Sequence, residues 1–311
     1  MFGHVRRIFA VTPGMFIAFA LSGCTDDVGD EQKLSMDDVA TTTQAVENGE
    51  LDPFMGEGVI QLYIWNGSNW GYCSGQVIAR DTVLTAGHCF WNNGFHATDQ
   101  DVYVAIYDDA DANLTPDGSN PWVLAEVFMR QAFIDGRNAG NATRGEDVAV
   151  VRTPNNMSNV SSSDAAALAR YTSERPDWLF LFGYGYYTDT NWDKQLRSGA
   201  MDDPTWSTAN KTITTDYGTS DPHACMYDSG GPYKHQTFEF MSFSGVQFAV
   251  QSGAGGSAYC YEDQAVGAMV AYHDTWIEDL VNDGAGACSY ETYTMFLDGW
   301  NYGTIHALLC W

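Results

Sequence analysis

The segment Cys225–Pro232, which reads Cys-Met-Tyr-Asp-Ser-Gly-Gly-Pro, holds the residues of this chain that could most readily do chemistry. Ser229 follows an acidic residue, Asp228, and precedes two glycines, which let the backbone come close to a substrate. A serine hydroxyl in such a turn is a candidate nucleophile, but it needs a base because it is weak at its ordinary pKa. Alone, the same pattern also fits an ordinary turn of a β-rich protein.

A histidine and an aspartate earlier in the chain could act together with this serine. His88 lies in Leu84–Cys89 (Leu-Thr-Ala-Gly-His-Cys), directly after an apolar run. Asp147 lies in Glu146–Val151 (Glu-Asp-Val-Ala-Val-Val), at the head of a short apolar strand. A base and an acid are therefore available if the fold brings these segments to the serine.

In the chain order His88, Asp147, Ser229, the three motifs resemble those of the trypsin-like (chymotrypsin-fold) serine peptidases. That family carries Thr-Ala-Ala-His-Cys-type, Asp-Ile-Ala-Leu-type and Gly-Asp-Ser-Gly-Gly-Pro motifs, and other serine triads run in a different order. The resemblance implies an endopeptidase that cleaves protein or peptide substrates without a cofactor. Ser229 would attack the scissile carbonyl, His88 would take its proton and later donate it to the leaving amine, and Asp147 would orient the imidazole.

Short strands separated by turns, from residue 46 onward, favour an all-β barrel or sandwich. The resemblance implies two six-stranded antiparallel β-barrels packed together, with a C-terminal helix and a short extension. The clearest expected elements are strands at Val59–Trp65, Gln76–Thr85, Val102–Tyr107, Val123–Val127, Val148–Val151, Trp178–Tyr187 and Gln247–Ser252, and a helix at Val270–Asn282.

The peptidase domain is expected to span residues 46–283, with barrel one at about 46–157 and barrel two at about 158–283. The connection between the barrels contains an Ala-rich piece that we expect to be briefly helical. Residues 284–311 lie outside the resemblance and form a C-terminal extension. Its aromatic residues are expected to pack against the protein rather than to bind a ligand.

The N-terminus, residues 1–23, is typical of an export signal. Arg6 and Arg7 precede the mostly apolar stretch Ile8–Ala20, which fits a secretory signal rather than a transmembrane helix. The stretch ends in Leu-Ser-Gly-Cys, which resembles the lipobox of bacterial lipoproteins and implies lipidation of Cys24. Ordinary signal cleavage beside an incidental cysteine is the alternative.

Residues 24–45 are expected to form a flexible acidic tether or propeptide, because a polar, acid-rich composition cannot bury enough apolar surface to fold. By resemblance to Gram-negative lipoproteins, threonine rather than aspartate after Cys24 favours the bacterial outer membrane or cell surface. No long apolar run follows the signal. We therefore expect membrane attachment only through a lipid at Cys24.

Seven cysteines in an exported chain favour disulfides over free buried thiols. Six remain if Cys24 carries lipid. Three pairs are expected, the first two by resemblance to the family's bridges and the third because its members remain: Cys73–Cys89, Cys225–Cys260 and Cys288–Cys310.

Tyr227 departs from the family pattern, which has glycine two residues before the serine. By resemblance, the backbone N–H groups of Tyr227 and Ser229 would form the oxyanion hole. A side chain in a backbone conformation that suits glycine costs about 1–3 kcal/mol, and losing one donor lowers the rate by about 10²–10³. Two interpretations stay open: a relaxed loop that still presents the N–H, or a catalytically weak or inactive surface binding protein.

Substrate preference is less readable. His223 occupies the position at which trypsins carry a pocket-floor aspartate, so a Lys or Arg preference is not supported. A protonated His223 would favour an acidic or polar side chain, whereas a neutral one would be a core histidine. Ser252 and Gly253 are candidate substrate-binding residues, and both Gln251–Gly253 and Ser252–Ala254 can be aligned with the family's substrate-binding strand.

Val46 and Asp228 indicate an activation step. In the family, the carboxylate before the serine pairs with an α-amino group freed by proteolysis, and Val46–Gly49 resembles a degenerate Ile-Val-Gly-Gly start. Cleavage after Ala45 would expose Val46 and would also release the domain from the lipid. The alternative is an ordinary first strand, with Asp228 paired internally.

Composition excludes some partners. Forty acidic and 14 basic residues give a formal net charge of −26, which argues against nucleic acids and anionic membrane surfaces. No cluster has metal-ligand spacing; Asp108, Asp109 and Asp111 could bind calcium, but a solvated acidic turn is the simpler interpretation. We expect a monomer that is exported, lipid-anchored and released after processing.

Overall fold

The computed structural model describes residues 46, 50–51, 58–108, 114, 122–141, 143–186, 192–216, 222–235, 245–255, 264–284, 286–298 and 301–311. The expected signal peptide, Cys24, the tether, Cys260, Asp109 and Asp111 lie outside these residues. Within the described residues, no helix is long and apolar enough to cross a bilayer.

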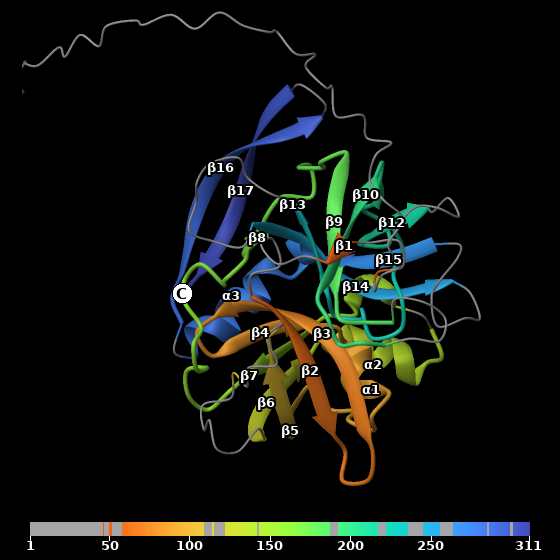
Figure 1. The fold of residues 1–311 in the computed structure, drawn as a ribbon, viewed down its shortest axis with the longest axis vertical. Helices are drawn as coiled ribbons and strands as arrows, with labels where there is room; N and C mark the ends of the chain where they lie inside the picture. The colour runs from red at the N-terminus through yellow and green to blue at the C-terminus, as the bar shows by residue number, and fades with distance from the viewer. Residues whose placement is uncertain are drawn as a thin grey trace, which may run out of the picture. The chain divides into compact units, whose positions relative to one another are not determined.

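Apolar and alternating segments of the first half form a closed antiparallel barrel, drawn in orange to yellow-green in Figure 1. The strands pair in the order β2-β3-β4-β7-β6-β5. Their bounds are β2 Val59–Trp65, β3 Trp70–Ala79, β4 Thr82–Thr85, β5 Asp99–Tyr107, β6 Val123–Met129 and β7 Ala149–Arg152. β-branched and aliphatic side chains such as Val104, Val127 and Val150 fill the barrel and are fully buried, as suits pleated strands with one packed face.

Within the described residues, three short helical elements interrupt this barrel. Helix α1 (Gly87–Trp91) follows β4, helix α2 (Gln131–Asn138) follows β6, and the 3-10 turn η2 (Arg144–Glu146) precedes β7. Strands β4 and β7 are paired neighbours. The histidine motif follows the end of β4 and the aspartate motif precedes the start of β7, so the two motifs lie at the same edge of this pair.

The second half is a curled half-barrel, an 11-stranded sheet as counted in the described residues. Its main path runs β1-β10-β9-β13-β14-β15-β12-β11. The bounds are β1 Glu50–Leu51, β8 Ala167–Ala169, β9 Trp178–Gly183, β10 Arg197–Asp202, β11 Thr205–Ser207, β12 Thr212–Asp216, β13 Pro232–His235, β14 Val246–Gly255, β15 Gln264–Met269, β16 Cys288–Asp298 and β17 Asn301–Cys310. The 3-10 turn η3 (Val270–Tyr272) and helix α3 (Asp274–Asn282) follow β15, where one helix was expected.

Two local expectations are wrong. The stretch Gln76–Thr85 was expected as one strand, but a turn at Arg80 and Asp81 divides it into β3 and β4. The Ala-rich connection is strand β8 rather than a helix. It is fully buried between β14, with which it pairs in parallel, and β17, so tertiary pairing overrides the helix propensity of alanine.

The C-terminal extension is a long hairpin that belongs to the second sheet (blue in Figure 1). Strands β16 and β17 pair along their length, and a disulfide joins Cys288 to Cys310 at its base. Strand β17 continues the sheet through its pairing with β8. Exposed Thr304 and His306 alternate with buried Ile305 and Ala307, so one face of the strand packs into the core.

Substitution of Ile305 tests whether this hairpin contributes to the stability of the domain. Ile305 is fully buried in the main core, so Ile305→Ala is expected to lower the free energy of unfolding by about 2–5 kcal/mol. Thr304→Ala, at the exposed neighbour, should change it by less than about 0.5 kcal/mol. Urea unfolding of both variants measures the difference, and equal stabilities would show that the hairpin packs only loosely.

Candidate active site

Asp147 and His88 form the most tightly constrained pair of ionisable side chains in the site. The His88 ring Nδ1 lies 2.6 Å from Asp147 Oδ2, and the backbone N–H of His88 donates to Asp147 Oδ1 at 2.7 Å. The Asp147 residue is 3 % exposed. A carboxylate so placed accepts the Nδ1 proton, which leaves Nε2 of the neutral imidazole as an acceptor.

The second half of the chain completes the surroundings of this aspartate. Ser252, on β14, donates its hydroxyl to Asp147 Oδ2 at 2.6 Å. The ring Nε2 of His273 lies 2.8 Å from the carbonyl of Gly145, in the turn just before Asp147. Burial lowers the pKa of His273 to about 4, so the ring is neutral and donates its Nε2–H to that carbonyl. Both halves therefore fix the position of Asp147.

Ser229 lies in a turn that is held against the first barrel. The backbone N–H of Ser74, on β3, donates to the Ser229 carbonyl at 2.8 Å, and the Ser74 hydroxyl donates to the carbonyl of Tyr227 at 2.9 Å. Gly230 has φ +86°, and a Cβ there would lie 2.0 Å from Thr85 Oγ1. Only glycine permits this conformation and this approach, so the first glycine after the serine has a structural reason.

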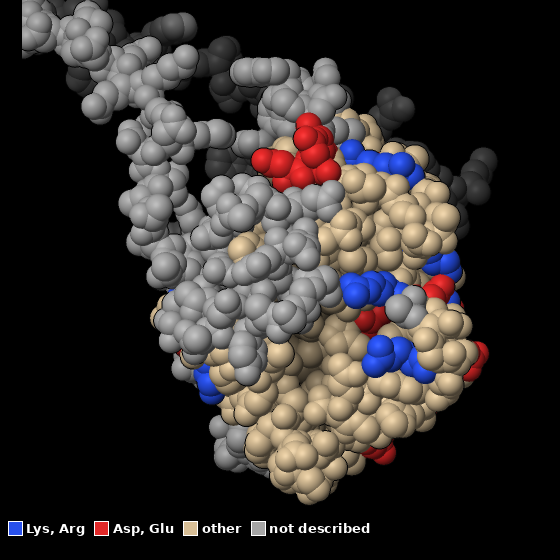
Figure 2. Space-filling view, turned by 90° about the vertical axis from the view of Figure 1, so that its right-hand side faces the viewer, with Lys and Arg blue, Asp and Glu red and all other residues tan. Residues whose placement is uncertain are grey.

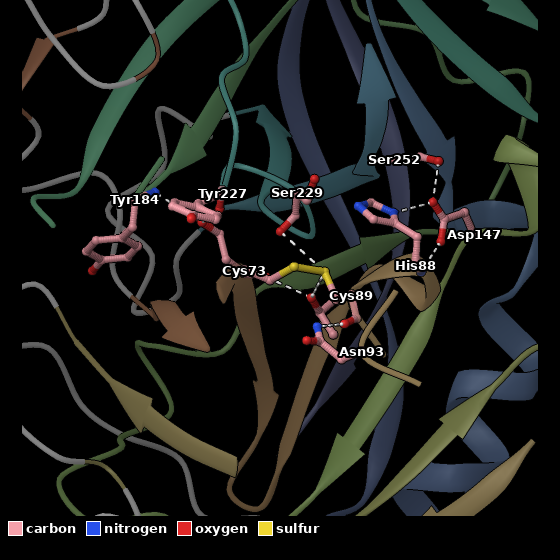
Figure 3. The surroundings of a disulfide bond; sticks show 11 residues. Cys73, His88, Cys89, Asn93, Asp147, Tyr184, Tyr227, Ser229 and Ser252 are labelled. Carbon is pink, nitrogen blue, oxygen red and sulfur yellow. Dashed lines mark hydrogen bonds and ion pairs between the residues drawn. A yellow bond between two sulfur atoms is a disulfide. The ribbon is translucent and has the colours of Figure 1, made fainter. Parts of the chain in front are cut away.

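The serine and the histidine face one another across the site. Figure 3 shows the imidazole of His88 between Asp147 and Ser229, with its second ring nitrogen on the side of the serine. No hydrogen bond joins the Ser229 hydroxyl to that nitrogen among the hydrogen bonds of the described residues. The backbone N–H of Ser229 also has no acceptor in the described part of the chain.

A cleft of about 470 Å³ runs past these residues. Its described lining comes from both halves and consists of Gly71, Tyr72, Cys73, His88, Cys89, Asn92, Asn93, Phe133, Arg137, Thr143, Arg144, Asp147, Met226, Tyr227, Ser229, Ser252 and Gly253. The histidine, aspartate and serine that sequence motifs singled out thus share one cleft.

Tyr227 has φ +77°, a left-handed conformation that glycine adopts more readily. Its ring packs in an aromatic cluster with Tyr72, Tyr186 and Trp192, at centroid distances of 5.3, 5.3 and 4.9 Å. Aromatic pairs of this geometry contribute about 0.5–1.5 kcal/mol each beyond their burial. The cluster can therefore offset the backbone strain at this residue.

Asp228 is fully buried beneath the serine turn. Its carboxylate accepts hydrogen bonds from the backbone N–H groups of Cys225 at 2.7 Å and Gly185 at 2.8 Å, and from the backbone of Val46. Burial raises the pKa of Asp228 to about 7, although these hydrogen bonds and the charge of Arg197 oppose the rise. Val46 is itself fully buried.

A disulfide joins Cys73 to Cys89 beside the cleft, as Figure 3 shows. Cys225 is also disulfide-bonded, and its expected partner, Cys260, lies outside the described residues. His223, which was expected at the floor of the specificity pocket, is buried and is not among the described residues that line the cleft. Ser252 and Gly253 do line it.

Several site residues were not found from the sequence. Ser74 anchors the serine turn, and its only sequence signal is its position next to Cys73. Arg144 and Arg137 line the cleft, but their distance in sequence from the motifs does not predict that position. Only the folded barrel brings them to the cleft. No group of three or more His, Cys, Asp or Glu side chains in the described residues could hold a metal ion.

Comparison with solved structures places this arrangement in a known fold. Neuropsin, a serine protease expressed in the limbic system of mouse brain, superposes with a TM-score of 0.54 and 17 % sequence identity, covering 75 % of this chain and 98 % of neuropsin. An HL collagenase structure superposes with a TM-score of 0.53 and 18 % identity, covering 76 % and 98 %. At these identities the likeness shows the fold alone, which is chymotrypsin-like and all-β, as predicted.

A family model adds evidence from the sequence itself. The model named Trypsin matches residues 55–268, more than half of the chain, including the whole first barrel and most of the second sheet, but neither β1 nor the C-terminal hairpin. The matched segment contains His88, Asp147 and Ser229, which the fold brings to one cleft. The chain therefore belongs to the trypsin family.

Proposed function

We propose that this protein is a serine endopeptidase that works through His88, Asp147 and Ser229 and an acyl-enzyme intermediate. The observation that carries the proposal is the buried Asp147 carboxylate, 2.6 Å from His88 Nδ1, on the wall of the cleft that Ser229 lines. That contact leaves the other ring nitrogen free to act as a base toward the serine.

Each residue has a defined task in the proposed reaction. His88 Nε2 takes the hydroxyl proton as Ser229 Oγ attacks the scissile carbonyl carbon, and the imidazolium then gives that proton to the leaving amine. Asp147 stabilises the imidazolium, and Ser252 holds Asp147. The backbone N–H groups of Ser229 and Tyr227 would stabilise the oxyanion of the tetrahedral intermediate. Water then attacks the acyl-enzyme by the same steps.

Export and release are part of the proposal. The N-terminal sequence supports secretion, lipidation at Cys24 and anchoring at the outer membrane or cell surface. Cleavage after Ala45 would free the α-amino group of Val46 beside Asp228 and would cut the domain from its anchor. The backbone hydrogen bond between Val46 and Asp228 supports this step, because it brings the new terminus to the carboxylate without any large movement.

Labelling with a fluorophosphonate probe tests the nucleophile and the activation step together. Residues 41–45 of the full chain are replaced by Asp-Asp-Asp-Asp-Lys, so that enteropeptidase exposes Val46 in an otherwise unchanged preparation. We expect labelling at Ser229 after cutting and at least about tenfold slower labelling before it, because an uncut chain lacks the ammonium partner of Asp228.

Ser229→Ala in the same chain is the control and should not label. Labelling at equal rates before and after cutting would support the peptidase and contradict the activation step. Absence of labelling in cut, folded protein would contradict the peptidase and favour a surface binding protein. Recovery of an active chain with a lipidated Cys24 and an intact tether would also contradict release by activation.

The pH dependence of stability tests the state of Asp228. In the uncut chain the folded pKa of about 7 lies above the ordinary value of 3.8, so the folded state binds more protons than the unfolded state between these values. The contribution of Asp228 to the free energy of unfolding should therefore fall as pH rises through this window, by up to about 1.4 kcal/mol per pH unit. His273, whose pKa burial lowers to about 4, contributes with the opposite sign and is the same in every variant compared.

Cutting before Val46 should flatten that slope, because the new ammonium group favours ionised Asp228 and lowers its pKa. Asp228→Asn should flatten it as well, without cutting. Urea unfolding from about pH 4 to pH 8 gives the slopes. An equal slope in the cut and uncut chains would show that the terminus does not pair with Asp228.

Substitution of Tyr227 separates the enzyme from the inactive binding protein. Tyr227 already has a positive φ, so its backbone need not change when the residue becomes glycine. Tyr227→Gly should therefore alter the labelling rate by less than about threefold, while loss of the ring from its cluster lowers stability by about 1–3 kcal/mol. An increase of about 10²–10³ in labelling would show that the tyrosine disables the oxyanion hole.

A further inference from the structure

Two arginines line the cleft beside the proposed catalytic residues. Arg144 lies in the turn that precedes Asp147, and Arg137 lies at the end of α2. The guanidinium of Arg144 lies over Gly253, where a Cβ would come within 3.0 Å of Arg144 Nη1. On the face drawn in Figure 2, basic atoms lie beside a hollow, with acidic atoms between them.

Neither arginine has an acidic partner among the described residues. Arg144 Nη1 is buried and makes no hydrogen bond there. Arg137 is exposed; its Nη2 donates to the amide oxygen of Asn92 at 3.1 Å, and its guanidinium lies 5.8 Å from the centre of the Trp91 ring. Burying part of the Arg144 guanidinium without a partner costs free energy, which an acidic group of a ligand would offset.

The nearest carboxylates are engaged elsewhere. Asp147 is the one acidic residue in the described lining of the cleft, and its oxygens are occupied by His88 and Ser252. Glu146, two residues from Arg144, forms ion pairs with Lys211 and Arg130. Neither of these acids therefore forms an ion pair with Arg144.

The composition of the chain makes this pairing pattern unusual. With 40 acidic and only 14 basic residues, a basic side chain has many potential partners in this protein. Two of those 14 line one cleft, and neither forms an ion pair with a carboxylate among the described residues. An acidic group brought by a ligand would complete the charge balance and could accept two parallel hydrogen bonds from a guanidinium.

We infer, on the basis that the protein is the peptidase proposed above, that Arg144 is a specificity-determining residue that selects substrates with an aspartate or glutamate close to the scissile bond. Arg137 adds to the positive potential at the entrance of the same cleft. Asp147 keeps its role in catalysis because its carboxylate already accepts hydrogen bonds from His88 and Ser252.

Cleavage of a peptide library by the enteropeptidase-activated chain tests the inference first without any substitution. Mass spectrometry of the products locates the cleaved bonds and scores aspartate and glutamate on either side of them. A matched pair of peptides, identical except for glutamate or glutamine at the enriched position, then gives kcat/KM. We expect the glutamate peptide to be cleaved about tenfold faster, as one charge-assisted hydrogen bond would allow.

Variants of Arg144 assign that preference. Arg144→Gln should bring the ratio of the two peptides to about 1, Arg144→Lys should keep part of it, and Arg144→Glu should favour a lysine peptide instead. Arg137→Gln should lower the ratio less. Arg175→Gln, at an exposed arginine bonded only to the Thr172 carbonyl among the described residues, is the matched control and should leave it unchanged.

The outcomes separate this inference from the proposed function. No cleavage of any peptide and no probe labelling at Ser229 would overturn the peptidase itself. Cleavage without enrichment of acidic residues, or an acidic preference that survives in Arg144→Gln, would overturn the role of Arg144 and leave the peptidase intact. Circular dichroism and Ser229 labelling of each variant establish that it is folded before its ratio is interpreted.

Discussion

The site depends on the hydrogen bonds that the buried carboxylate of Asp147 accepts. A carboxylate that is 3 % exposed must be hydrogen-bonded or it destabilises the fold. Its donors come from both halves of the chain: the amide and ring of His88 from the first barrel, and the hydroxyl of Ser252 from the second sheet. The hydrogen bonds of Asp147 can therefore all form only when the two halves are correctly packed together and the imidazole of His88 is correctly oriented.

Asp228 is a second buried carboxylate near the serine that is held by hydrogen bonds. Its carboxylate is fully buried and is held by the amides of Cys225 and Gly185 and by the backbone of Val46. These donors do not fully replace water, since burial still raises the pKa of Asp228 to about 7. A carboxylate in that state gains most from an added positive charge, and a freed α-amino group at Val46 would supply one at the position that the amide now occupies.

The sequence predicted those parts of the structure that local signals encode. The motifs around His88, Asp147 and Ser229 indicated the family, and the apolar pattern at Val59–Trp65 gave β2 with its observed bounds. Other parts depend on tertiary pairing. Apolar residues on both sides of the charged pair Arg80 and Asp81 led to the prediction of one strand across the turn. Strand β8 is a strand only because β14 and β17 flank it. Alternation in β17 was present in the sequence, but the hairpin lies outside the family match.

The arginines of the cleft could not be predicted for a different reason. A side chain without a partner can be recognised only when the positions of all nearby acids are known. A net charge of −26 acts over the whole surface and opposes the approach of an acidic peptide, but salt screens it within about 8–10 Å. The guanidinium of Arg144 would act on an acidic substrate at contact and in a partly buried site, where screening is weak. Long-range repulsion and short-range attraction can therefore coexist, and in the proposed peptidase the contact term would decide which bound substrate is held in place for cleavage.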